Sequence, residues 1–229
     1  MSQPMSLPMS SPRPTRNARA LAILAGVLAA GALAAGALGC GARAAAPVNL
    51  DGTWPEKPGD YRAVHEQWTR DDGRRSYESM IFHVYATFKS PAWRAAHASY
   101  LADRQKMSNA SRAALLAQTR QASETEPYEV HILLTTQDRR ENDLTRGKRS
   151  VWRLVLVDQN GTEIEPISVQ RDRRPRDVIK AEYPDFDDFA EPYVARFPRD
   201  ITLLGPGIER FSLKLGSTRG GVELIWSKR

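Results

Sequence analysis

Cysteine is almost absent from this chain of 229 residues, which contains a single one, Cys40. A lone cysteine cannot form a disulfide framework within one chain, and it cannot build a zinc or iron–sulfur site made of cysteines. Histidine is also scarce, with four residues, and no two of them are spaced i, i+2 or i, i+4. The sequence therefore predicts neither a metal site nor a cofactor.

The signatures of the common enzyme families are missing as well. The chain has no GxxxxGK[ST] phosphate-binding loop, no GxGxxG dinucleotide motif and no HExxH metalloprotease motif. The segment 216–220 places a serine between glycines, but the serine stands second and strands are expected on both sides. This is not the strand-to-helix turn of a nucleophile elbow. We therefore expect a non-enzymatic protein.

Acidic residues are missing from the first 39 positions, which carry three arginines, Arg13, Arg16 and Arg19. An uninterrupted apolar run follows from Leu21 to Gly39, with seven large aliphatic residues, eight alanines and four glycines. A basic stretch ahead of such a run is the pattern of an export signal. Residues 1–39 are therefore predicted to be a signal peptide.

Cys40 ends this run, directly behind Ala37, Leu38 and Gly39. The tetrapeptide ALGC resembles the lipobox of bacterial lipoproteins, in which a small residue precedes a cysteine that is lipidated and becomes the mature N-terminus. That family usually carries leucine where this chain has Ala37. The resemblance implies a lipid anchor on Cys40, with acyl chains such as palmitate, that makes a transmembrane helix unnecessary. Because Gly41 and not aspartate follows, it also implies the outer membrane where the organism has one.

Two other fates of the N-terminus stay open. The small-x-small sequence Ala42, Arg43 and Ala44 is a site for ordinary secretion, where cleavage would discard Cys40 and release a soluble periplasmic or secreted protein. Alternatively, the apolar run remains uncleaved and anchors the chain by itself. The mass of the mature N-terminus separates all three arrangements.

The rest of the chain is expected to form one globular domain over residues 58–229. Residues 40–57 are rich in Ala, Pro and Gly and predict a flexible tether ahead of it. Asp60 can cap a short helix in which Tyr61 and Trp68 recur at helical spacing. A mature chain of about 190 residues is long enough for a single core.

A helical hairpin is predicted at about residues 91–123. Ser90 and Pro91 provide a cap and a first-turn proline for a helix that runs through about Lys106. A second helix is expected at about 110–122. The hairpin follows residues 80–88, where β-branched and aromatic residues alternate and predict a buried strand.

Strands and turns dominate the β-rich part, about residues 127–229. The Asn160–Gly161 pair is the strongest hairpin turn signal, and the predicted strands are 128–134, 151–158, 162–170, 193–197, 211–215 and 222–226. Together with 80–88 they make seven short strands. This number favours a mainly β fold, an immunoglobulin-like antiparallel β-sandwich with the helical hairpin inserted between its first two strands. A single α+β domain is the alternative.

Two arginine-rich segments stand out after the signal. Residues 139–149 have a net charge of +3 and residues 171–177 a net charge of +2. In a sandwich two strand reversals separate these loops, so we expect both at the same end of the domain. Clustered guanidinium groups bind phosphates and carboxylates bidentately. The candidate anion-binding residues are Arg139, Arg140, Arg146, Lys148, Arg149, Arg171, Arg173, Arg174 and Arg176.

An acidic segment lies between these arginines and the next strand. Residues 182–191 carry five carboxylates interleaved with three aromatic residues. The segment lacks the glycine and the regular spacing of a calcium loop. We expect a solvated loop that its aromatic side chains pin to the domain.

These observations favour a cell-envelope lipoprotein of binding or structural type. Its partners would be the membrane, through the anchor on Cys40, and an anionic envelope lipid, glycan or protein, through the arginine-rich loops. Nucleic acid is not expected, because the basic loops are not interleaved with aromatic residues. The alternative is a secreted or envelope hydrolase with a site near His83 and His131, where two imidazoles on neighbouring strands could meet.

Overall fold

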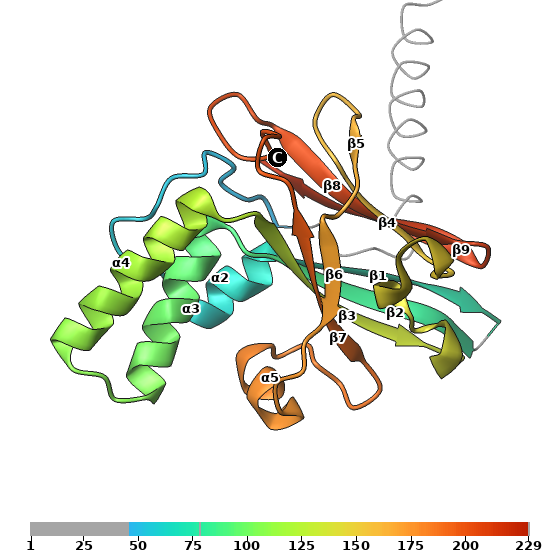
Figure 1. Cartoon of the computed structure of the whole chain (residues 1–229), viewed down its shortest axis with the longest axis horizontal. Helices are drawn as coiled ribbons and strands as arrows, with labels where there is room; N and C mark the ends of the chain where they lie inside the picture. The colour runs from blue at the N-terminus through green and yellow to red at the C-terminus, as the bar shows by residue number, and fades with distance from the viewer. Residues whose placement is uncertain (1–45, 78, 229) are drawn as a thin grey trace, which may run out of the picture. The chain divides into compact units, whose positions relative to one another are not determined.

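The computed structural model describes residues 46–77 and 79–228, which fold into two antiparallel sheets with a few helices (Figure 1). They belong to one compact unit, Ala45–Arg229. The expected mainly β class is confirmed. The predicted signal peptide, Cys40 and the alternative cleavage site lie outside the described residues.

The described elements include four helices and nine strands. In chain order they are α2 (Tyr61–Trp68), β1 (Thr69–Ser76), β2 (Ser79–Phe88), α3 (Pro91–Arg104), α4 (Asn109–Thr125), β3 (Tyr128–Thr136), β4 (Arg153–Val157), β5 (Glu163–Ile164), β6 (Ser168–Arg171), α5 (Arg176–Glu182), β7 (Glu191–Phe197), β8 (Arg210–Ser217) and β9 (Gly220–Ser227). Two short 3₁₀ turns, η1 (Arg139–Glu141) and η2 (Leu144–Arg149), separate β3 from β4.

The two sheets share one hydrophobic core. The first has the strand order β1-β2-β3-β7-β6 and the second the order β5-β4-β8-β9. Phe88 of β2 contacts Phe211 of β8 across the core, with ring centroids 4.7 Å apart, and Phe211 stacks on Trp226 of β9 at 5.1 Å. All three rings are almost fully buried. Two sheets that pack their apolar faces together form a sandwich-like arrangement.

The sheets meet along one edge, where β1 lies beside β9. The buried Arg70 of β1 donates from Nε to the carbonyl oxygen of Ile225 in β9 (2.7 Å) and from Nη2 to that of Ala46 (2.6 Å). Trp226 donates from Nε1 to the carbonyl oxygen of Trp68 (2.9 Å). At this junction, side-chain donors thus bind backbone carbonyl oxygens that would accept from backbone N–H groups in a continuous sheet.

Helices α2 and α3 begin where the sequence predicts them to begin. Asp60 accepts a hydrogen bond from the backbone N–H of Ala63 and caps α2, and Ser90 caps α3 by accepting from Trp93 N–H at 3.1 Å, with Pro91 as the first residue of the helix. Helices α3 and α4 occur at about the residues expected for the helical hairpin. Because β1 precedes β2, they lie between the second and third strands and not between the first two as expected.

Three elements differ from the sequence prediction. Residues 69–76 form the strand β1, although their sequence is mostly charged and polar; they are the edge of the sheet, where such residues face solvent. The expected strand 162–170 is wrong as one element: it divides around Pro166 into β5, which pairs with β4, and β6, which pairs with β7 in the other sheet. Residues 176–182, expected as part of a loop, form the short helix α5.

The flexible tether cannot extend to residue 57 as expected. Val48 and Leu50 are buried in the core, and the backbone N–H of Val48 donates to the carbonyl oxygen of Ser227 at 2.9 Å, which extends the edge of β9. Because apolar side chains and a strand-like hydrogen bond hold this segment, the chain belongs to the domain from Val48 onward. Residues 40–45 lie outside the described part.

The outer face of the five-stranded sheet is covered by helices instead of solvent. Tyr183, directly after α5, stacks on His131 of β3 with ring centroids 3.6 Å apart, and Arg94 of α3 pairs with Glu129 of β3. Every residue of β3 is therefore buried, on both faces of the sheet. The polar residues of this strand consequently meet the helices and not water.

Candidate functional site

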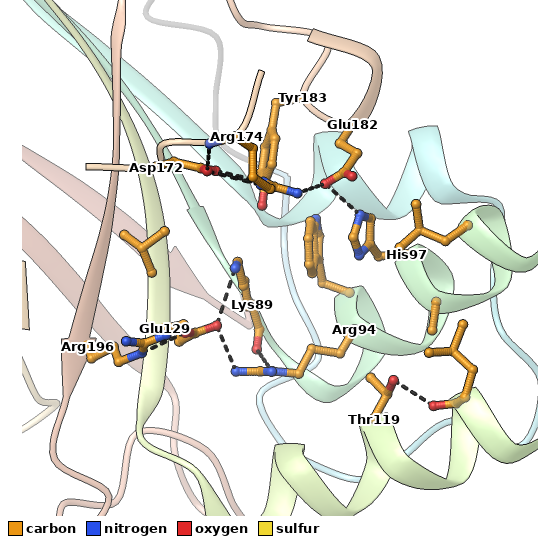
Figure 2. A pocket seen from close by; sticks show the side chains of 15 residues that line it. Lys89, Arg94, His97, Thr119, Glu129, Asp172, Arg174, Glu182, Tyr183 and Arg196 are labelled. Carbon is orange, nitrogen blue, oxygen red and sulfur yellow. Dashed lines mark hydrogen bonds and ion pairs between the residues drawn. The ribbon is translucent and has the colours of Figure 1, made fainter. Parts of the chain in front are cut away.

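A cavity of about 250 Å³ lies between the helical hairpin and this outer face of the sheet (Figure 2). Its wall comes from the end of β2, from α3, α4, β3 and β7, and from the segment around α5. Charged residues make up about half of the wall: Lys89, Arg94, Glu129, Asp172, Arg174, Glu182 and Arg196. The remaining lining residues are Trp93, His97, Ala98, Leu101, Leu115, Thr119, Tyr183 and Val194.

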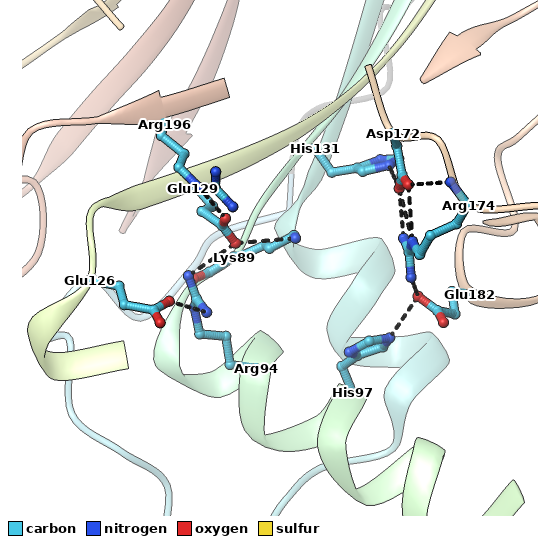
Figure 3. Close-up of polar contacts among 10 residues, drawn as sticks. All are labelled: Lys89, Arg94, His97, Glu126, Glu129, His131, Asp172, Arg174, Glu182 and Arg196. Carbon is cyan, nitrogen blue, oxygen red and sulfur yellow. Dashed lines mark hydrogen bonds and ion pairs between the residues drawn. The ribbon is translucent and has the colours of Figure 1, made fainter. Parts of the chain in front are cut away.

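One group of charges surrounds Glu129 (Figure 3). Its carboxylate accepts from Lys89 Nζ at 3.2 Å, from Arg94 Nη2 at 3.3 Å and from Arg196 Nε at 2.9 Å. Burial raises the pKa of Glu129, but the attraction of Lys89 and Arg94 outweighs this effect and brings the pKa below its ordinary value. Three cations thus share one buried carboxylate, and Arg94 also lies 3.9 Å from the exposed carboxylate of Glu126.

Together with Arg94, Lys89 is one of the two mostly buried cations of this group. Its side chain is 16% exposed, and its ammonium group lies 5.9 Å from the ring centroid of Trp93. Burial lowers the pKa of Lys89, and the positive charges of Arg94 and Arg174 add to that effect against the attraction of Glu129. The surroundings of Lys89 therefore destabilise its charged form relative to water.

A second group of charges surrounds Arg174. Its guanidinium donates from Nη2 to Asp172 at 2.7 Å and from Nη1 to Glu182 at 2.6 Å. Each of these two carboxylates also accepts from a histidine: Asp172 from His131 Nε2 at 3.3 Å, and Glu182 from His97 Nε2 at 3.2 Å. Burial opposes ionisation, but these donors hold the pKa of Asp172 far below its ordinary value. The result is a continuous chain from β3 to α3 (Figure 3).

His131 is neutral in this arrangement. Its side chain is fully buried, and burial, with the positive charges of Lys89 and Arg174, lowers its pKa to about 4 in spite of the hydrogen bond to Asp172. Nε2 therefore carries the proton that is donated to Asp172, and Nδ1 is a buried acceptor without a partner among the described residues. The stacked ring of Tyr183 covers one face of the imidazole.

Three of the four histidines converge around two tyrosines. His65 of α2 donates from Nε2 to Asp185 at 2.9 Å and accepts from Trp93 Nε1 at 3.3 Å. Tyr61 lies 5.7 Å from the His65 ring and 5.3 Å from the His97 ring, and Tyr183 stacks on His131. Each histidine faces its own carboxylate, so the pairs form separate hydrogen bonds. Within the described residues no group of histidine and carboxylate side chains is arranged to hold a metal ion.

No sequence pattern indicates this convergence. Its residues come from α2, α3, β3 and the segments around α5, and no spacing along the chain connects them. The predicted pairing of His83 with His131 is not found: the two lie on the same face of neighbouring strands, but His83 is opposite Thr135 and His131 is opposite Thr87. His83 is partly exposed and pairs with Asp71 at 3.2 Å instead. The structure therefore does not place these two histidines in one site.

The arginines of residues 171–177 are mostly engaged within the domain. Arg174 lines the cavity, as described above. Arg171 lies 3.6 Å from Glu191 and donates to the carbonyl oxygen of Asn142. Arg176 donates to the carbonyl oxygen of Asp188 at 2.9 Å and lies over the ring of buried Phe186. Arg176 and Phe186 thus pin the acidic segment to the domain, and three predicted surface cations have internal partners.

Other members of the predicted basic set remain exposed. The bond between Arg171 and Asn142 brings the segment 171–177 against the segment 139–149. Arg146 pairs with Asp143 at 3.4 Å. For the remaining five, no described carboxylate lies within 4.0 Å; we call them the basic loop surface, and they are Arg139, Arg140, Lys148, Arg149 and Arg173.

Comparisons with known proteins give no relative: no protein-family model, no curated protein and no solved structure matches this chain. In addition, no helix between residues 46 and 228, residue 78 excepted, combines the length and hydrophobicity that crossing a bilayer requires. The chemistry of the site must therefore be argued from its own residues. The cavity offers a net positive, partly apolar wall, and the basic loop surface offers exposed cations.

Proposed function

We propose that this protein is a cell-envelope lipoprotein of non-enzymatic, binding type. The signal peptide and the ALGC tetrapeptide support an anchor on Cys40, and Gly41 after it supports the outer membrane where there is one. The domain on this anchor would be an immunoglobulin-like β-sandwich with the helical hairpin inserted between β2 and β3. This finer fold assignment rests on the two antiparallel sheets and their common core.

The observation that supports a binding role is the basic loop surface. Its five cations are exposed and, among the described residues, have no carboxylate within reach, whereas Arg171, Arg174 and Arg176 satisfy their guanidinium groups internally. Unpaired guanidinium groups are weakly hydrated and match phosphate oxygens bidentately. We therefore assign the phosphate groups of envelope lipids as the partner of this surface.

The anchor is tested by replacing its cysteine. A chain with Cys40→Ala should lose metabolic labelling with palmitate and accumulate as an uncleaved or mislocalised precursor. Mass spectrometry of the mature N-terminus should find an acylated Cys40 in the unaltered chain. A normally processed, soluble product of the variant would overturn the anchor.

The basic loop surface is tested by chromatography of the full chain in non-ionic detergent on phosphocellulose. Replacing four of its arginines with glutamine should lower the NaCl concentration at which the protein elutes, because fewer counterions exchange on binding. The matched control replaces four exposed arginines on other parts of the surface, Arg62, Arg75, Arg120 and Arg210. Equal elution of both variants would mean that net charge alone governs binding. Carboxymethyl cellulose serves as the second resin and separates phosphate recognition from general cation exchange.

A hydrolase with a site near His83 and His131 was the alternative expectation. The separate positions and separate carboxylate partners of the two histidines do not favour it. Replacing both with alanine should leave binding to phosphocellulose unchanged if the protein is a binding module.

A further inference from the structure

The cavity beneath the helical hairpin has a charge that its own residues do not balance. Four of its lining residues are cations, Lys89, Arg94, Arg174 and Arg196, and three are carboxylates, Glu129, Asp172 and Glu182. His97 adds no charge at neutral pH, because burial lowers its pKa below the ordinary value. The lining residues thus carry a formal excess of one positive charge, in a space that is partly open to solvent. Glu126, which does not line the cavity, lies 3.9 Å from Arg94 and is 56% exposed. A single negative charge inside the cavity would neutralise the excess of the lining residues.

Lys89 has hydrogen-bonding capacity for such an anion. An ammonium group has three N–H donors, and among the described residues Glu129 is its one hydrogen-bond acceptor, at 3.2 Å. The guanidinium of Arg174, by contrast, is already divided between Asp172 and Glu182. In Figure 2 the ammonium of Lys89 points from the Glu129 group toward Arg174, so it stands between the two charged groups. An anion there would meet a donor with free N–H groups and a second cation nearby.

Part of the cavity wall is apolar. Leu101 and Ala98 of α3, Leu115 of α4 and Val194 of β7 line it together with the ring of Trp93. A hydrated inorganic ion gains nothing from such a surface, whereas a hydrocarbon group gains about 25 cal/mol for each Å² that it removes from water. The volume of about 250 Å³ lies just below the range of about 300–1,000 Å³ that is usual for drug-sized ligands. The occupant is therefore small.

We infer that this cavity binds a small organic monocarboxylate, with its carboxylate on Lys89 and its hydrocarbon group against Leu101 and Leu115. One ammonium with free N–H groups, on Lys89, and a formal excess of one positive charge among the lining residues favour one carboxylate over a dicarboxylate or a phosphate dianion. The site is separate from the basic loop surface and does not depend on the function proposed for that surface. It is also independent of how the chain is anchored.

Calorimetric titration of the full chain in non-ionic detergent tests this site. The probes are benzoate and hexanoate, and their uncharged counterparts are benzamide and hexanamide. At least one carboxylate should bind saturably, and its amide should bind at least about tenfold more weakly, since a neutral carbonyl replaces the charged acceptor of the Lys89 ammonium. This comparison needs no variant. If neither carboxylate binds, or if amide and acid bind equally, the inference is wrong.

Two pairs of variants locate the site. Lys89→Met removes the ammonium and leaves Glu129 with two arginine partners, so affinity for the carboxylate should fall about tenfold or more. Lys180→Met removes the same charge from the exposed face of α5 and should not change affinity. Leu115→Phe should fill the apolar end and weaken hexanoate binding, whereas Leu116→Phe, at the adjacent position that does not line the cavity, should not. Unchanged affinity in both Lys89→Met and Leu115→Phe would overturn the assignment.

Discussion

At the scale of single residues, burial decides which charges the domain carries. Lys89 directly follows β2, and His131 lies on the neighbouring strand β3. Lys89 pairs with Glu129, a carboxylate that three cations share. His131 loses its charge and keeps one hydrogen bond to Asp172. Since both groups are largely buried, the pKa of each differs between the folded and the unfolded chain.

His131 should make the domain less stable in mild acid. The unfolded chain binds a proton on this imidazole below its ordinary pKa of 6.5, whereas the folded chain does so only near pH 4. The unfolded state thus holds more protons between these values, and the free energy of unfolding falls as the pH is lowered through this window, by about 3 kcal/mol in total. His97, whose pKa is also lowered, acts in the same direction.

Urea unfolding at several pH values between 4 and 7 measures this effect. In His131→Gln the loss of stability on acidification should be smaller than in the unaltered chain, because the titrating group is gone. His83→Gln, at a partly exposed position, is the matched control and should retain the full pH dependence. An identical slope in His131→Gln and the unaltered chain would contradict the assignment to His131.

At the scale of elements, the start of α3 positions part of the cavity wall. Trp93, Arg94 and His97 all lie within its first two turns. The buried hydroxyl of Ser90 accepts from the N–H of Trp93 at 3.1 Å and fixes where the helix begins. A change at this cap therefore reaches the cavity through the helix.

Removing the cap of α3 should cost measurable stability. Ser90→Ala leaves the N–H of Trp93 without its acceptor, and we expect the free energy of unfolding to fall by about 1 kcal/mol. Ser76→Ala, at an exposed strand end, should have almost no effect. Thermal unfolding followed by circular dichroism measures both, and equal midpoints for the two variants would contradict the role of the cap.

Elements with a local signal could be predicted from the sequence, and those without one could not. The alternating apolar residues of β2 and the Ser90–Pro91 start of α3 depend on neighbouring residues alone, and both were found. Strand β1 has no apolar alternation, because it is an edge whose charged residues face solvent. The division of residues 162–170 between two sheets depends on partners far along the chain, which local patterns do not contain.

The candidate site could not be predicted for the same reason. His65, His97 and His131 meet because α2, α3 and β3 pack together, and their carboxylate partners follow them by 41 to 120 positions. The charge of Arg174 could be read from the sequence, but its inward direction could not, since that depends on Asp172 and on Glu182 one helix later. Composition identifies the charges; packing determines which of them face solvent.

At the scale of the whole molecule, the domain begins earlier than composition indicates. Leu50 is fully buried, and its carbonyl oxygen accepts from the N–H of Gly205 at 2.7 Å. Leu50→Ala should lower the free energy of unfolding by about 2–5 kcal/mol, because it opens a cavity in the common core. Ile167→Ala, at a 62% exposed position, should change it by less than about 0.5 kcal/mol. Chemical denaturation compares the two variants. An unaltered midpoint for Leu50→Ala would mean that this segment belongs to the tether and not to the folded domain.

The hydrogen bond between Val48 and Ser227 and the ion pair of Asp51 with Lys228, at 3.0 Å, bring the first and last described segments of the domain together. A short peptide could therefore join residue 228 to residue 46, and new ends could be opened at the exposed Asn160–Gly161 turn. Such a circular permutant should form the same two sheets with the strands in a different order along the chain. The structure would then not depend on the order in which its strands are synthesised.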